Sequence, residues 1–187
     1  MKSFAVFALT VLLALPALAQ RQTFTVNPDA SEVTMTLNTT HEVVHGTFHV
    51  HSGSIDFDRS APKMSGAVIV VAGSGKTGNG SRDKRMNKEI LQVERHATVS
   101  FEPKSYAGTI APSGDSTIQV TGIFTLLDAP HEITIPMLVH LEGATATAKA
   151  HFPLPYIEWG LKDPSLLFWK ADKDVAIDLS LTGQISK

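Results

Sequence analysis

Apolar and polar residues alternate along most of this chain, and the alternation restricts the fold more than any other feature of the sequence. The clearest runs are 33–37, 118–126, 133–141 and 175–181, where every second residue is apolar or glycine. A β-strand places successive side chains on opposite faces, whereas helical spacing does not produce such sets. We therefore predict strands that each bury one face.

Two stretches depart from simple alternation. Phe48 and Val50 share one parity, whereas Ile55 and Phe57 share the other, so we predict a bulge or bend at the intervening Ser-Gly-Ser, 52–54. Residues 67–72 are continuously apolar, which predicts a strand covered on both faces.

The segment 81–94 carries the only helical spacing. Ser81 can act as its cap, and the pattern predicts one short helix. A second helical turn is predicted at Asp163-Pro164, with Asp163 as the cap and Pro164 at the first helical position. About eight strands with one short helix, and no alternation of strands with helices, indicate an all-β antiparallel sandwich or barrel.

One predicted strand, 144–152, has an unusual face. Its even positions are all alanine up to residue 150. Such a face leaves room either for a ligand or for a closely packed neighbouring element, and both interpretations stay open. A barrel of about eight strands is either filled by its own side chains or holds one small ligand.

The amino terminus has the pattern of a secretory signal peptide. Lys2 precedes an apolar run over 4–15, Pro16 follows, and Ala17-Leu18-Ala19 matches a cleavage site. The run is shorter than the roughly 20 residues that a membrane span needs. We therefore predict a signal peptide at 1–19, a single domain at 20–187, and export to the periplasm.

Composition excludes several classes of protein. The 187 residues include no cysteine, which excludes disulfides, thiolate metal sites and a cysteine nucleophile. The formal net charge of -2 argues against a nucleic-acid partner.

Two motifs suggest a chemical function. Residues 73–78 match G-x-G-x-x-G, but no βαβ unit surrounds them, so we interpret them as a flexible loop before the helix. His41, His45, His49 and His51 share one parity but are too spread along a strand for a three-ligand zinc site. They fit an outward polar face. No G-x-S-x-G elbow occurs. We predict no catalytic residue, no metal and no cofactor.

A basic cluster lies in the predicted helix, at Arg82, Lys84, Arg85 and Lys88. It fits a solvated helix face. It also fits a site for a phosphate or other polar head at a barrel mouth, because the planar guanidinium suits phosphate oxygens.

The chain resembles the YceI-like, polyisoprenoid-binding family of bacterial periplasmic proteins from about Phe24 to Gly183. The similarity lies in Val44-His45-Gly46-Thr47-Phe48, in the segment 52–58, in Thr77-Gly78-Asn79 with Arg82-Asp83, and in 120–126. The chain departs from the family pattern at Ala30, Lys76, His96-Ala97, Leu127-Asp128 and 155–165. The resemblance implies a lipocalin-like antiparallel barrel whose apolar tunnel holds an isoprenoid chain.

We therefore predict a non-enzymatic periplasmic carrier for a long apolar amphiphile, a polyisoprenoid such as an isoprenoid quinone or a prenyl phosphate. The alternatives are a metal-dependent hydrolase that uses the histidine strand and a stress-related interaction protein with a filled barrel. A lipid is the expected partner and nucleic acid is not, while transient membrane contact and a homodimer stay open. The predicted ligand-binding residues are Met35, Leu37, Phe48, Val50, Val120, Phe124, Ile135, Met137, Val139 and Arg82.

The signal peptide gives the first testable prediction. Export should be followed by cleavage after Ala19, because the small-x-small motif ends there. The intact mass of protein from the periplasmic fraction measures this, and a mature protein that retains residues 1–19 would contradict it.

Overall fold

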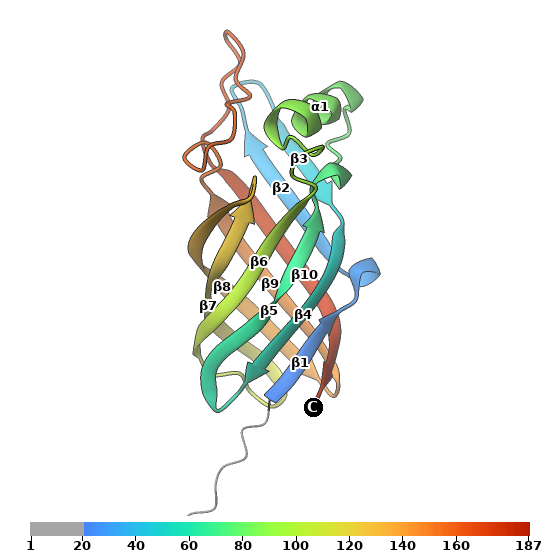
Figure 1. The fold of residues 1–187 in the computed structure, drawn as a ribbon, viewed down its shortest axis with the longest axis vertical. Helices are drawn as coiled ribbons and strands as arrows, with labels where there is room; N and C mark the ends of the chain where they lie inside the picture. Colours follow the sequence, from blue (N-terminus) through green and yellow to red (C-terminus); the bar gives the residue numbers. More distant parts are fainter. Residues whose placement is uncertain (1–20) are drawn as a thin grey trace, which may run out of the picture.

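The computed structural model describes residues 21–187, so the predicted signal peptide and Gln20 lie outside the described residues. The chain forms a tall, closed antiparallel barrel (Figure 1). Its strands are β1 (Arg21–Val26), β2 (Glu32–Asn38), β3 (Val43–Phe48), β4 (Val50–Asp58), β5 (Ala61–Val71), β6 (Thr98–Gly108), β7 (Gly114–Leu126), β8 (Ala129–Glu142), β9 (Thr145–Leu154) and β10 (Val175–Ser186). No helix within the described range is long and apolar enough to cross a bilayer.

The ten strands make eight positions around the barrel. The carboxyl-terminal part of β10 pairs with β1 and its amino-terminal part pairs with β2, so β1 and β2 act as one interrupted strand. β4 pairs with β1 and β3 with β2, which makes a second interrupted strand. Each remaining strand pairs with its sequence neighbours, and β10 closes the barrel onto β1. The prediction of about eight antiparallel strands is confirmed, and the barrel is the correct one of the two architectures.

A short 3-10 turn, Pro28–Ala30, causes the first interruption. Asn27 caps it, because the Asn27 side chain accepts a hydrogen bond from the Asp29 N–H at 3.1 Å. The Ser31 hydroxyl donates to the Asn27 carbonyl at 2.7 Å and accepts from the Thr182 N–H at 3.0 Å. The turn is therefore tied to β10, and the strand resumes beside the same partner.

The parity predictions are largely correct. The β4–β5 register shifts between Val50 and Ser52, one or two residues before the predicted 52–54 bulge. The β7–β8 register runs without a shift through Pro136, so Met137 points inward and Leu138 is 46% exposed. The prediction for 67–72 is wrong, because the outward residues of β5 are only half-buried on the outside of the barrel.

The helix consists of α1 (Gly80–Arg85) and a π-helical turn, Met86–Ile90. Its cap is Asn79 rather than the predicted Ser81, because the Asn79 side chain accepts from the N–H groups of Ser81 and Arg82 at 3.0 and 3.1 Å. The second predicted helical turn is also wrong. Asp163 accepts from the Ser165 N–H at 2.8 Å, but the chain then forms a hairpin instead of a helix.

Barrel closure yields the second prediction. A Cβ at Gly183 would collide with the carbonyl oxygen of Thr25 on β1, whereas a Cβ at Gly80 meets nothing within 4 Å. Gly183→Ala should lower the free energy of unfolding by about 1–3 kcal/mol. The control Gly80→Ala should leave it unchanged or raise it by up to about 1 kcal/mol. Urea unfolding measures both, and equal stability of the two variants would contradict the close β1–β10 approach.

Candidate functional site

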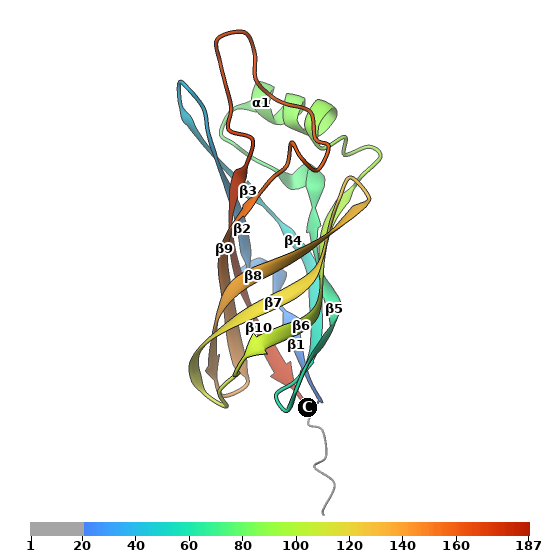
Figure 2. The same cartoon turned by 90° about the vertical axis from the view of Figure 1, so that its left-hand side faces the viewer.

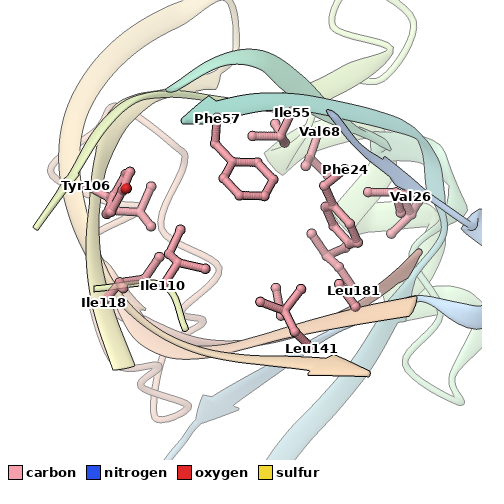
Figure 3. Packing of buried hydrophobic residues seen from close by; sticks show 14 of the residues in the cluster. Phe24, Val26, Ile55, Phe57, Val68, Tyr106, Ile110, Ile118, Leu141 and Leu181 are labelled. Atoms are coloured by element: carbon pink, nitrogen blue, oxygen red, sulfur yellow. The ribbon is translucent and has the colours of Figure 1, made fainter. Parts of the chain in front are cut away.

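The barrel encloses an apolar cavity of about 640 Å³. Figure 3 shows inward-pointing Phe24, Phe57, Ile110, Leu141 and Leu181 around an open centre. Protein interiors are normally packed as densely as organic crystals, so a space of this size does not belong to a self-filled core. Its volume lies within the range of roughly 300–1,000 Å³ that is usual for ligand pockets.

The alanines of β9 explain part of this space. Ala146, Ala148 and Ala150 are buried and point into the barrel, and the first two line the cavity. Ala144 lies in the exposed turn before β9. Of the two interpretations of the alanine face, room for a ligand is the one that the geometry favours.

Nine of the ten predicted binding residues lie in the cavity wall or at its mouth. They are Met35, Leu37, Phe48, Val120, Phe124, Ile135, Met137, Val139 and Arg82. Val50 is buried at 5% exposure in the core but does not line the cavity. Ligand contact by these residues stays a prediction.

Much of the cavity wall was not predicted from the sequence. Ile118 and Leu141 belong to alternating runs that were recognised, as do Ile177, Leu179 and Leu181. Their shared parity was the signal that could have identified them. Phe24 and Phe152 come from segments where the alternation is less regular, and only closure of the barrel brings them to the same space.

The charged residues of the cavity lie at one end only. Its charged lining residues are Glu42, Arg82, Arg85 and Lys170, which all lie at the end that carries α1, here called the mouth (Figure 1). At the opposite end Ile110, from the β6–β7 loop, points into the barrel (Figure 3). The Tyr106 hydroxyl there donates to the Asp58 carbonyl at 2.8 Å. A ligand with an apolar tail and a polar head would place its head at the mouth.

Two segments cover the mouth: the α1 helix and the β9–β10 loop, 155–174 (Figure 2). Arg85 Nη1 donates to the Pro164 carbonyl at 3.1 Å, and Lys162 Nζ donates to Glu89 Oε2 at 2.6 Å. The lysine hydrogen bond and charge hold the pKa of the Glu89 carboxyl below its usual value. The Lys162–Glu89 contact is exposed and weak by itself, but Ile90 of the helix and Leu161 of the loop are both buried in one apolar cluster that also joins the two segments.

Aromatic residues fix the base of the β9–β10 loop. Trp159 stacks on His131 of β8, with ring centroids 4.1 Å apart, and packs against Phe124 of β7. The Tyr156 hydroxyl donates to the Asp172 carbonyl at 2.7 Å, and burial raises the pKa of Tyr156 to about 12. The Tyr156 hydroxyl thus links the two ends of the loop.

A second set of contacts, here called the rim network, fixes α1 to the barrel: Thr77, Arg82, Asp83 and Glu42. Asp83 Oδ1 accepts from the Thr77 N–H at 2.9 Å and from its hydroxyl at 2.6 Å. Arg82 donates from Nε to Thr77 Oγ1 at 2.8 Å and from Nη2 to the Thr77 carbonyl at 2.9 Å. Arg82 Nη1 reaches Glu42 Oε1 on the β2–β3 turn at 2.6 Å. Arg82 is thus engaged in positioning the helix, although it also lines the mouth.

The G-x-G-x-x-G segment is not the flexible loop that we predicted. The Thr47 N–H donates to the Lys76 carbonyl at 2.9 Å, and the Lys76 N–H donates to the Thr47 carbonyl at 3.0 Å. Gly75 lies against Phe48 and Met86, where a Cβ would overlap both side chains. Gly75 therefore permits close packing beside β3. This packing explains the glycine without a phosphate-binding loop.

The histidines lie outside the cavity. His45, His49 and His51 are exposed, and the His41 ring packs against Trp169 in a tilted arrangement with centroids 4.4 Å apart. Within residues 21–187, no three histidine or acidic side chains come close enough to hold a metal ion.

Comparison with known proteins now identifies the family. The model of the YceI-like domain matches residues 24–183. The chain belongs to the YceI-like domain family. A UPF0312 protein of Ectopseudomonas mendocina (strain ymp) is 30% identical over 98 residues, which is 51% of this chain and 47% of that protein.

Two solved structures share the fold. Burkholderia cenocepacia BcnA superposes with a TM-score of 0.69 at 19% identity, covering 87% of this chain and 99% of its own. A polyisoprenoid binding domain from Saccharophagus degradans, implicated in plant cell wall breakdown, gives 0.68 at 16% identity, covering 87% and 98%.

Two departures from the YceI-like pattern meet in space. His96 Nδ1 lies 2.7 Å from Asp128 Oδ2, which joins the segment before β6 to the β7–β8 turn. Leu127 and Asp128 both adopt positive φ, 51° and 59°, where glycine is usual. The His96 contact therefore joins this turn to the segment before β6.

The rim network leads to the third prediction. Hydrogen bonding from Thr77 lowers the pKa of Asp83 below its ordinary 3.8, so the carboxylate stabilises the fold above about pH 4 and this stabilisation is lost as the pH falls through the lowered value. Asp83→Asn should lower Tm by about 3–6 °C at pH 7 and by less at pH 3. Thermal melting of both proteins at the two pH values measures this, and a gap that does not change with pH would contradict it.

Proposed function

We propose that this YceI-like protein is a periplasmic carrier that binds a long isoprenoid amphiphile, a quinone or a prenyl phosphate, with its tail in the barrel and its head at the mouth. One observation carries the proposal. The cavity is apolar along the barrel, and its charged groups are confined to the end that α1 and the β9–β10 loop cover. That polarity matches an amphiphile with one polar end.

The energetics suit such a ligand. Burial of one five-carbon isoprene unit contributes about 4 kcal/mol before ordering costs, at ~0.8 kcal/mol per carbon group. Several units in the cavity supply ample affinity without polar recognition. The isoprenoid class is further supported by the polyisoprenoid binding domain that shares this fold.

The alternative functions have less support. A metal-dependent hydrolase would need His45, His49 and His51 beside a substrate, but these side chains are exposed and none of them lines the cavity. A filled barrel does not agree with a cavity of about 640 Å³. A non-catalytic binding protein agrees with both observations.

Substitution of Met137 tests the carrier function. Met137 lines the cavity from β8, and Met137→Trp should occupy the space that the tail needs. Because the barrel has room, Tm should change little. Ala148→Phe on the neighbouring strand should act in the same way. Lipids extracted from each protein, purified from its native host, are measured by mass spectrometry, and both variants should lose most of the isoprenoid that the wild type carries.

Leu138→Glu is the matched control, because Leu138 follows Met137 but faces outward. It should retain the wild-type amount of lipid. Absence of isoprenoid from the wild type, or equal amounts in all four proteins, would contradict the carrier function. If the barrel were filled by its own side chains, Met137→Trp would overpack the core and lower the free energy of unfolding by about 1–3 kcal/mol.

A further inference from the structure

Exposed apolar side chains gather at the mouth. Among residues 21–187, five of the six large apolar side chains that are exposed lie there: Val43, Leu166, Leu167, Phe168 and Trp169. Leu167 and Phe168 are 88% and 86% exposed. Single exposed apolar residues are ordinary, but a contiguous group usually marks an interaction site.

Four of the five residues form a hairpin, 166–169, here called the tip, and Val43 begins β3. Leu166 and Trp169 exchange backbone hydrogen bonds of 2.9 and 2.6 Å across the tip. The Thr40 N–H donates to the Lys170 carbonyl at 2.9 Å, and the Thr40 hydroxyl donates to the Phe168 carbonyl at 3.3 Å. The tip therefore has a defined position on the β2–β3 turn, and it projects beyond the barrel in Figures 1 and 2.

Several lysines at the mouth have no ion-pair partner in the described part of the chain. The segments that form this end, 39–42, 80–91 and 155–174, hold seven lysines and arginines and seven acidic residues. Lys84, Lys88, Lys170 and Lys173 form no ion pair with a carboxylate in the described part of the chain. An apolar projection with free cations around it complements the surface of a bilayer that contains anionic lipids.

The same residues border the cavity. Leu166, Trp169 and Lys170 belong both to this surface and to the lining of the mouth. We propose that the protein docks on an anionic lipid bilayer through the tip, with Leu167 and Phe168 entering the interface and the mouth facing the membrane. The docking proposal rests on the proposed carrier function, because a carrier must receive its ligand from a membrane.

The shape of the surface favours a bilayer over a second copy of the chain. A stable dimer buries about 800 Å² per partner over a complementary surface. The tip is instead a hairpin of four residues that projects beyond the barrel (Figure 2), and its exposed apolar side chains are those of Leu166, Leu167, Phe168 and Trp169. Tryptophan and lysine beside the projecting Leu167 and Phe168 are the residues that membrane interfaces favour.

Vesicle binding tests the proposal. The purified protein is sedimented with vesicles of phosphatidylethanolamine and phosphatidylglycerol, and separately with vesicles of phosphatidylcholine alone. The wild type should bind the anionic vesicles more strongly, and this binding should fall as salt is added. Leu167→Ser/Phe168→Ser should reduce the partition coefficient at least about tenfold, since two apolar side chains no longer enter the interface. Lys84→Gln/Lys88→Gln should weaken binding to the anionic vesicles only.

Leu138→Ser is the matched control, because it removes an exposed leucine from the barrel wall, and it should bind as the wild type does. Wild-type protein that binds neither vesicle, or a tip variant that binds like the wild type, would overturn the proposal. Concentration-dependent dimerisation lost only in the tip variant, without vesicle binding, would assign the surface to self-association instead. If the wild type binds vesicles but carries no isoprenoid, the docking proposal is supported and only the proposed carrier function is contradicted.

Discussion

The pairing of β10 with β1 is the interaction on which the rest of the structure depends. Without it the sheet would have two free edges and an apolar inner face open to water. With it, the inner faces of all strands enclose one space. Gly183 permits the close approach because it has no Cβ to meet the Thr25 carbonyl. A small residue at one position thus allows both the barrel and its cavity.

What the barrel encloses depends on the size of its inward residues. Ala146 and Ala148 leave space opposite larger aliphatic and aromatic side chains. The rim network then places α1 over the mouth, through hydrogen bonds among Thr77, Arg82 and Asp83 and an ion pair to Glu42. The motif that most resembles the family, Thr77-Gly78-Asn79 with Arg82-Asp83, is therefore a structural unit that positions the cover. This accounts for the motif without assigning a catalytic role to it.

The alternation of apolar and polar residues predicted the strands and their inward faces well. It predicted less well what covers each strand and where the helix begins. The parity of Met137 and Leu138 was correct because β8 stays in register with β7 through Pro136. The apolar run 67–72 was misinterpreted, since a barrel leaves its outer face to solvent and an apolar composition does not say which neighbour covers it. The helix cap was misplaced by two residues, because Asn79 and Ser81 are both good caps and only the geometry distinguishes them.

The sequence by itself determined the β-strands, their inward and outward faces, the short helix and the small residues of β9. These follow from period, propensity and side-chain size, which are local properties. Closure onto β1, the volume of the cavity, the engagement of Arg82 by Glu42 and the projection of Leu167 and Phe168 beside the mouth were decided by the tertiary structure. Each of them depends on residues far apart in the chain, whose distances no local pattern encodes.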